Sequence, residues 1–266
     1  MRNRLAILVA LFFLLVAFIP GARAAEYEET IKKQFIVSGD AEVIVRNVNG
    51  AVNIETWDNP KVEILAYKSA HGNNSRKVRK YFNSIEINFE QREKKIWVET
   101  HLPKRNGNGF FDWLLGDNIS GRVEYEIRLP AGVNLEVKTT NGKISVSGVK
   151  GLVKLKSTNG AIWGENISGM VEAKTTNGAI QMSLKEVAPG EELGFYTTNG
   201  SIRLKLPEDL SCTLDAKTTN GSIYSDFEIR TLGKVKPNRL KGKIGSGDGL
   251  LELRTVNGSI KLLKNS

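Results

Sequence analysis

The chain has 266 residues, 40% of them hydrophobic and 25% charged, and a formal net charge of +9. Its one cysteine, Cys212, excludes an internal disulfide, so burial and hydrogen bonds must hold the fold together, and we expect this thiol to be buried and inert. The length suffices for one elongated domain or two compact ones, and the positive charge favours anionic partners.

Residues 1–24 have the pattern of a secretion signal. A basic start precedes an apolar stretch, Leu5–Ile19, and Ala22-Arg23-Ala24 supplies a small-x-small cleavage site. An uncleaved membrane anchor is the alternative, although the apolar stretch is short for a bilayer span. Cleavage after residue 24 removes three arginines and no acid, so the mature chain keeps a net charge of +6.

We therefore expect an exported protein that is periplasmic, at the cell surface or extracellular. Export argues against nucleic acid as a partner. Anionic polysaccharide, lipid head groups and envelope proteins remain as partners for a basic surface. The sequence indicates neither the ligand nor the oligomeric state.

After the signal we divide the chain into three parts. Residues 25–68 form an N-terminal β segment that contains the first Asn-Gly pair of a series. Residues 69–120 are an insertion, in which His71–Tyr81 is a basic surface loop or short helix and Ile85–Glu99 alternates like strands. Residues 121–266 carry the repeats.

The insertion ends in a loop with an apolar tip, Pro103–Asp117. One hypothesis is a finger for a membrane interface or a partner, with Lys104 and Arg105 beside it for anionic head groups. The alternative is a plug that covers the open end of a repeat stack. The apolar residues of the tip are Phe110, Phe111, Trp113, Leu114 and Leu115.

The repeats are marked by Asn-Gly pairs, three of them inside the sequence K-T-T-N-G. The spacings from residue 141 to residue 220 are 18, 18, 22 and 21, and Lys241–Ile244 is a candidate for a degenerate marker before the last pair. These turns are interpreted as structural, not as ligand sites. The asparagines of the series are Asn49, Asn141, Asn159, Asn177, Asn199, Asn220 and Asn257.

Apolar residues recur at fixed distances from each asparagine. Positions −6 and −4 are apolar in every unit, and position +3 is Val52 in the first unit and Ile in the others, from Ile144 to Ile260. Alternate residues are mostly polar, which is the pattern of a strand with one buried face. Each unit is therefore strand, Asn-Gly turn, strand, and the chain is predicted to be all-β.

Two architectures fit this pattern. Each Asn-Gly could close a two-residue hairpin, which gives an antiparallel β meander. Each unit could instead be one coil of a single-stranded right-handed parallel β-helix, a β-solenoid. We prefer the solenoid, because stacked asparagines can exchange amide hydrogen bonds from coil to coil, whereas hairpins need no such identity.

The segment Arg122–Gly151 reads R-V-E-Y-E-I-R-L-P-A-G-V-N-L-E-V-K-T-T-N-G-K-I-S-V-S-G-V-K-G and is followed by further T-x-N-G-x-I units. It resembles the bacterial putative-adhesin family. The resemblance covers residues 121–263 and, more loosely, residues 35–68. It implies a secreted or envelope protein with single-stranded β-helix repeats, and it says more about fold than about function.

Signs of catalysis are sparse. His71 and His101 lie in no metal-binding or triad-like spacing, and no hydrolase motif occurs. The glycine-rich stretch Gly245–Gly249 lacks the helix that a phosphate loop needs, so a tight bend explains it better. We expect no catalytic residue, no metal and no cofactor. Acids at position −5 could stack into a ladder, but their neighbours are cations and we expect a solvated face; they are Glu136, Glu172, Asp215 and Glu252.

Position −3 is mostly basic, and under the stacked model it forms a cationic stripe along one face. Like charges one coil apart are unfavourable unless a partner matches them, so we hypothesise that an anionic polymer binds there; a charge-balanced surface is the alternative. The stripe consists of Arg46, Lys138, Lys156, Lys174, Tyr196, Lys217 and Arg254.

The sequence thus favours a non-enzymatic, adhesin-like binding protein of the cell envelope. A polysaccharide-active β-helix enzyme is the first alternative, because such folds host enzymes with clustered carboxylates. An envelope scaffold or signalling partner that binds no glycan is the second.

Overall fold

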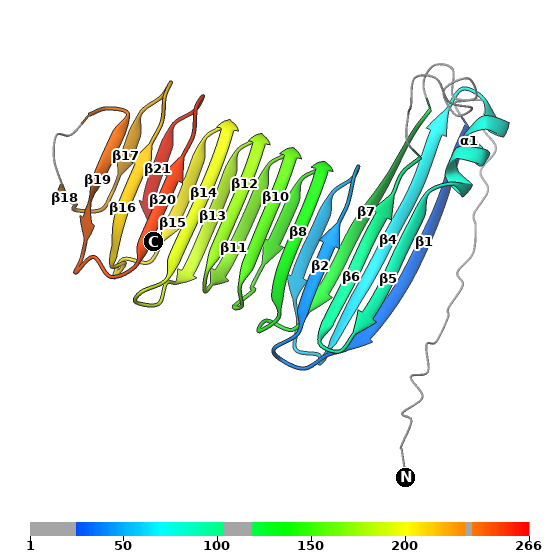
Figure 1. Cartoon of the computed structure of the whole chain (residues 1–266), viewed down its shortest axis with the longest axis horizontal. Coiled ribbons are helices and arrows are strands. Elements are labelled where there is room, and N and C mark those ends of the chain that lie inside the picture. Colours follow the sequence, from blue (N-terminus) through cyan, green and yellow to red (C-terminus); the bar gives the residue numbers. More distant parts are fainter. Residues whose placement is uncertain (1–24, 104–118, 232–235, 266) are drawn as a thin grey trace, which may run out of the picture.

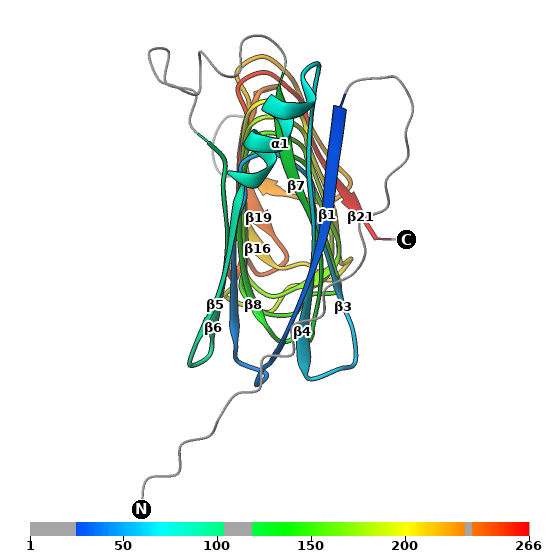
Figure 2. The same cartoon turned by 90° about the vertical axis from the view of Figure 1, so that its right-hand side faces the viewer.

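The computed structural model describes residues 25–103, 119–231 and 236–265, and these form an elongated stack (Figure 1). The predicted signal at residues 1–24 and the apolar tip at residues 110–115 lie outside the described residues. Two sheets run along the stack and face each other across the interior, as Figure 2 shows from the N-terminal end. No helix in the described ranges is long and apolar enough to cross a bilayer.

Sheet A contains ten strands in the described chain. In spatial order they are β1 (Ala25–Ile36), β4 (Lys61–Gly72), β7 (Ser120–Leu129), β3 (Val52–Thr56), β9 (Ile144–Ser147), β11 (Ile162–Ser168), β13 (Ile180–Glu186), β15 (Ile202–Leu206), β21 (Ile260–Lys264) and β17 (Ile223–Ser225).

Sheet B contains eleven strands in the same described ranges. In spatial order they are β18 (Arg230–Thr231), β19 (Arg239–Ile244), β16 (Cys212–Lys217), β20 (Leu250–Arg254), β14 (Glu192–Asn199), β12 (Val171–Asn177), β10 (Val153–Asn159), β8 (Asn134–Asn141), β2 (Glu42–Arg46), β6 (Lys95–His101) and β5 (Glu86–Arg92).

Each regular coil is a strand of sheet B, an Asn-Gly corner and a strand of sheet A. Consecutive coils pair in parallel in both sheets, so an antiparallel meander is wrong for this part of the chain. The residues at position +3 form one interior column and are fully buried except Ile223 in the last coil of the stack. In spatial order the column is Val52, Ile144, Ile162, Ile180, Ile202, Ile260 and Ile223.

The all-β prediction is confirmed, but each sheet is mixed and a purely parallel description does not cover the chain. At the N-terminal end, β1 and β4 pair antiparallel, as do β4 with β7 and β5 with β6. At the other end, β19 pairs antiparallel with β16 and with β18. The sequence Lys241–Ile244, expected to mark an extra coil, lies in β19, so that expectation was wrong.

The coils are not stacked in chain order. The last coil, β20–β21, lies between β14–β15 and β16–β17, and the first coil, β2–β3, lies between β6–β7 and β8–β9 (Figure 1). The coil nearest each chain end is therefore enclosed by coils on both sides. At the far end of the stack the edge strands β17 and β18 are thus internal segments of the chain, whereas at the near end β1 is the edge of sheet A.

One short helix, α1 (Ser75–Asn83), occupies the basic stretch expected to be a loop or short helix. The Asn74 side chain caps it by accepting a hydrogen bond from the backbone N–H of Lys77 at 3.1 Å. Its buried residues, Val78 and Tyr81, are three apart and so share one face. That face packs on β1 and β4 at the N-terminal end of the stack, where Figure 2 shows the helix between the two layers.

Candidate functional site

The Asn-Gly corners stack into one column that runs through seven coils. Each Asn side chain except Asn49 donates its amide N–H to the Oδ1 of the Asn on the neighbouring coil, over distances of 2.7–2.8 Å, and Asn49 donates to the Gly121 carbonyl at 3.3 Å. All amide groups inside the column thus have partners from the same column. In spatial order it contains Asn49, Asn141, Asn159, Asn177, Asn199, Asn257 and Asn220.

A second polar column, not anticipated from the sequence, lies two residues before each Asn and inside the stack. Its hydroxyl groups donate to the corner glycine carbonyl of the neighbouring coil, as Thr175 does to Gly160 at 2.9 Å. The same bond recurs at Ser157, Thr197, Thr255 and Thr218, over 2.8–3.1 Å. The signal was visible, because the first Thr of K-T-T-N-G repeats at this position.

The row of hydroxyl-to-carbonyl hydrogen bonds does not extend to the coils of Asn49 and Asn141. Asn47 occupies the corresponding position there and its amide donates to the Gly50 carbonyl at 3.1 Å. Thr139, one coil further, is 1% exposed and its Oγ1 has no hydrogen-bond partner. A buried hydroxyl without a partner is destabilising.

The glycine of each corner is required by the stacking. A Cβ added at Gly160 would lie 1.9 Å from the carbonyl oxygen of Gly142 in the neighbouring coil. No side chain can be accommodated there without moving the backbone. The Asn-Gly pairs are thus structural elements that set the spacing of coils.

Position −3 lies on the outward face of sheet B, where the structure brings the predicted stripe residues into one row. Their spatial order is Arg46, Lys138, Lys156, Lys174, Tyr196, Arg254 and Lys217. Neighbouring strands are about 4.8 Å apart, so the first four place cations at that interval. These four are exposed, and in the described chain none of them has an acidic partner.

The rest of the row is different, because Tyr196 and Arg254 contact acids and separate Lys217, an exposed cation without an acidic partner in the described chain, from the first four. Arg254 contacts Glu252 at 2.8 Å and Asp215 at 3.1 Å. The Tyr196 hydroxyl donates to Glu252 at 2.7 Å, and burial together with this bond raises the pKa of Tyr196 to about 12. We therefore restrict the term cationic row to Arg46, Lys138, Lys156 and Lys174.

The acids at position −5 do not form one ladder. Lys154 lies between Glu136 and Glu172, and Gly194 follows Glu172. Only Glu252 and Asp215 are neighbours, and both contact Arg254. The described residues contain no group of three or more His, Cys, Asp or Glu side chains that could hold a metal ion.

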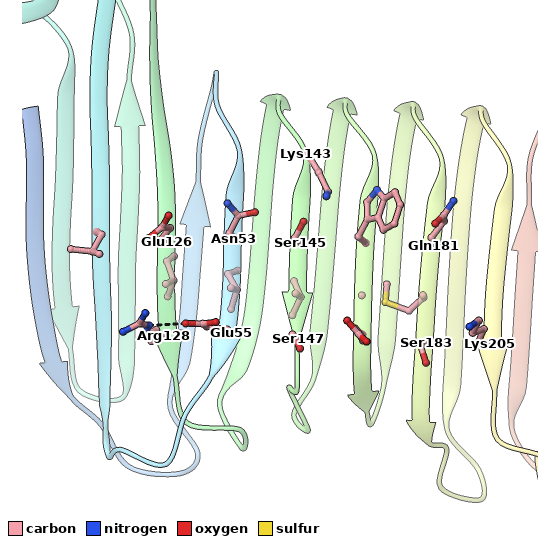
Figure 3. A pocket seen from close by; sticks show the side chains of 18 of the residues that line it. Asn53, Glu55, Glu126, Arg128, Lys143, Ser145, Ser147, Gln181, Ser183 and Lys205 are labelled. Carbon is pink, nitrogen blue, oxygen red and sulfur yellow. Dashed lines mark hydrogen bonds and ion pairs between the residues drawn. The ribbon is translucent and has the colours of Figure 1, made fainter. Parts of the chain in front are cut away.

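The outward face of sheet A carries a hollow of about 760 Å³ over β4, β7, β3, β9, β11, β13 and β15, shown in Figure 3. Small side chains, Ser145, Ser147 and Ser183, and Gly164 form much of its floor. The sequence analysis did not predict this hollow. Its central row, Ser145, Trp163, Gln181 and Arg203, lies four residues after the Asn of each unit, so this part was visible in the repeat and was overlooked, whereas the part on β4 and β7 lies outside the repeat.

At the β4–β7 end of the hollow the acids have partners. Glu55 binds Arg128 at 2.7 Å, and this hydrogen bond raises the pKa of Arg128. Glu63 binds Lys32 at 2.7 Å, and this bond holds the pKa of Glu63 below its usual value. Glu126 accepts a hydrogen bond from the Tyr67 hydroxyl at 3.0 Å.

Trp163 lies in the middle of the hollow, on β11, and is 43% exposed. The Lys143 ammonium lies 4.6 Å from the centre of its ring, a cation–π contact. Directly after Trp163 the strand bulges between Gly164 and Ile167, with Asn166 at a φ of 54°. A Cβ at Gly164 would lie 1.7 Å from the Met182 sulfur, so a larger residue there would require the Met182 side chain to move.

The histidines and the cysteine supply no reactive centre. His71 Nε2 lies 2.8 Å from the Ser120 hydroxyl, but this is an exposed pair between directly opposed residues of β4 and β7. His101 lies 3.7 Å from Glu99 on the same strand. Cys212 is a free buried thiol, as expected, and burial raises its pKa to about 11.

Comparison with known families gives one match over nearly the whole described chain. The model of the family described as Toastrack DUF4097 matches residues 25–263. This match confirms the resemblance seen in the sequence. No curated protein is similar enough to the chain to be matched to it.

Several solved structures match most of the chain at low identity and low TM-score. A putative cell adhesion protein from Clostridium sporogenes is 14% identical, with a TM-score of 0.46 over 89% of this chain and 100% of that one. A putative adhesin from Bacteroides fragilis is 12% identical, with a TM-score of 0.28 over 88% and 97%. A putative lipid binding protein from Parabacteroides distasonis is 11% identical, with a TM-score of 0.26 over 88% and 96%.

Proposed function

The chain belongs to the Toastrack DUF4097 family, and from this premise we propose that it is an exported, non-enzymatic, adhesin-like protein that binds anionic components of the cell envelope. The observation that carries the proposal is the cationic row on sheet B. Four exposed cations follow one another across adjacent strands without an acidic partner in the described chain.

Such a row is costly in the absence of a ligand. Like charges on directly opposed residues of adjacent strands repel each other, and an anionic polymer laid across the strands removes this repulsion. The backbone beneath the row is fixed, because the strands of Lys138, Lys156 and Lys174 each pair on both sides. A fixed, repeated spacing of cations favours an extended, repetitive ligand such as an anionic polysaccharide.

We also propose that the regular coils wind as a right-handed parallel β-solenoid. Each coil connects two parallel neighbours of sheet B, such as β8 and β10, through a strand of sheet A. Connections between parallel strands of one sheet are right-handed in nearly all proteins.

The test uses the mature chain, residues 25–266, and beads that carry a heparin-like sulfated glycan or lipopolysaccharide. We expect retention that falls as salt rises, because screening weakens contacts between exposed charges. The variant with Lys138, Lys156 and Lys174 changed to Gln should lose retention. A matched control changes three other exposed lysines, Lys150, Lys185 and Lys261, to Gln and should lose little.

Two results would contradict the proposal. Retention that ignores both salt and the three row lysines would show that the row does not bind. Turnover of an acidic glycan by the purified chain would contradict its non-enzymatic nature. Export is checked separately by finding the chain outside the cytoplasm only when residues 1–24 are present.

A further inference from the structure

We propose that the hollow on sheet A is a second binding site, and that it takes an acidic oligosaccharide, a chain of pyranose units that carries carboxylates. It is separate from the cationic row, which faces outward from sheet B. The central residue is Trp163, whose large aromatic side chain is exposed inside the hollow. Three of the residues that line the hollow are serines.

The side chains around Trp163 suit a sugar. One face of a pyranose presents C–H groups, which pack on the electron-rich face of an indole, while its rim presents hydroxyl groups. Ser145 and Gln181 are the direct neighbours of Trp163 on β9 and β13, and Asn53 lies one strand beyond Ser145. An amide both donates and accepts, so Asn53 and Gln181 can each pair with sugar hydroxyls (Figure 3).

The charges point to an acidic sugar. Glu55, Glu63 and Glu126 already have partners, whereas Lys143, Arg203 and Lys205 have no acidic partner within the described residues. Arg203 pairs with Gln181 across β13 and β15, and Lys143 contacts the Trp163 ring itself. A sugar stacked on Trp163 can therefore direct a carboxylate toward Lys143 and Arg203, which have no acidic partner in the described chain.

Glu165 is the acid closest to Trp163 along β11 and is exposed. It pairs with Ser147 on β9 and lies within the bulge between Gly164 and Ile167. The Glu165 carboxylate can accept hydrogen bonds from sugar hydroxyl groups. Glu165 therefore orients the ligand so that the carboxylates of the sugar face the cations.

The spacing of the site also suits a chain of sugars. Asn53, Ser145, Trp163, Gln181 and Arg203 lie on five successive strands, with about 4.8 Å between neighbours. This interval is close to the length of one pyranose unit in an extended chain. Successive sugars can therefore meet equivalent positions of successive coils.

The experiment titrates the mature chain with an oligosaccharide of three galacturonic acids and follows tryptophan fluorescence and heat release. We expect binding, with affinity reduced at least about tenfold in Trp163→Ala and in a Lys143→Gln, Arg203→Gln double variant. A neutral trisaccharide should bind at least about tenfold more weakly. Tyr224→Ala removes another exposed aromatic of sheet A, outside the hollow, and should leave affinity unchanged.

The outcomes separate this site from the cationic row. The variant of Lys138, Lys156 and Lys174 should keep its affinity for the trisaccharide, and Trp163→Ala should keep its retention on sulfated-glycan beads. The inference is overturned if the acidic trisaccharide does not bind, if the neutral one binds equally well, or if Trp163→Ala binds like the parent chain while melting at the same temperature.

Discussion

The Asn-Gly corners and the outward faces of the sheets obey opposite rules. At the corners the Asn-Gly pair recurs in every regular coil, and each Asn side chain inside the column bonds to the Asn of a neighbouring coil. On the outward faces the residues change from coil to coil, from lysine to tyrosine on sheet B and from serine to tryptophan on sheet A. At the corners stacking requires repetition, whereas on the outward faces residues can vary, as at Trp163, or recur, as in the cationic row, because stacking does not constrain them.

The two outward faces also differ from each other. Sheet B presents uncompensated charge in a row, whereas sheet A presents a hollow with an aromatic centre and paired acids at one end. A row of charges suits a long ligand that is held mainly by electrostatic attraction. A hollow with amides and an indole suits a shorter ligand with defined stereochemistry.

The largest expected effect comes from adding one methyl group at a corner. Gly160→Ala places a Cβ against the Gly142 carbonyl, so two coils must separate locally and their hydrogen bonds weaken. We expect a loss of about 3 kcal/mol or more in the free energy of unfolding, measured by urea denaturation. The control is Gly39→Ala, because a Cβ there meets nothing within 4 Å. Equal stability of both variants would contradict close stacking.

The next largest effect on stability distinguishes the regular corner at Thr175 from the irregular corner at Thr139. Thr175→Val leaves the Gly160 carbonyl without its hydroxyl donor and should cost about 1–2 kcal/mol. Thr139→Val removes a hydroxyl that has no partner, so its stability should stay equal or rise. Urea midpoints of the two variants give the difference directly. A larger loss at Thr139 would mean that its hydroxyl is bonded in solution.

The asparagine column should contribute less, because it is exposed and water can replace its bonds. Asn159→Ala removes one donated and one accepted amide bond, and we expect a loss of about 1 kcal/mol. Asn88→Ala, at an exposed strand position outside the column, is the comparison. Thermal unfolding of both variants checks the expectation, which fails if the two losses are equal.

The smallest effect on stability is expected on the outward face. Changing Lys138, Lys156 and Lys174 to Gln relieves repulsion between like charges and should raise stability by up to about 0.5 kcal/mol. The gain should shrink as salt screens the charges of the parent chain. Melting temperatures at low and high salt measure it. A clear loss of stability would show that these lysines hold the fold together.

The same contrast explains what the sequence could predict. The asparagine and isoleucine columns were visible, because residues that contact their own copies must repeat. The insertion of β20–β21 between two earlier coils was not, since every coil offers the same apolar pattern and therefore any order of stacking satisfies it.

What depends on that order was consequently missed. Glu252 reaches Tyr196 only because its coil is inserted beside β14, and this contact divides the predicted stripe in two. The row of Trp163 does not depend on that order, because Ser145, Trp163 and Gln181 each lie four residues after an Asn of the series on coils that stack in chain order; this column was overlooked. The threonine column was overlooked for a simpler reason, because a polar residue in an alternating strand was taken to face solvent.

The central claim is that the cationic row binds the ligand, whereas the Asn-Gly corners only stabilise the stack. The most direct test is a titration of a heparin-like sulfated glycan into three proteins under one low-salt condition. These are the parent chain, the variant of Lys138, Lys156 and Lys174, and Asn159→Ala. We predict that the less stable corner variant binds like the parent, whereas the face variant, at least as stable as the parent, loses binding by at least about tenfold. Equal binding by all three, or loss in the corner variant alone, would contradict the account.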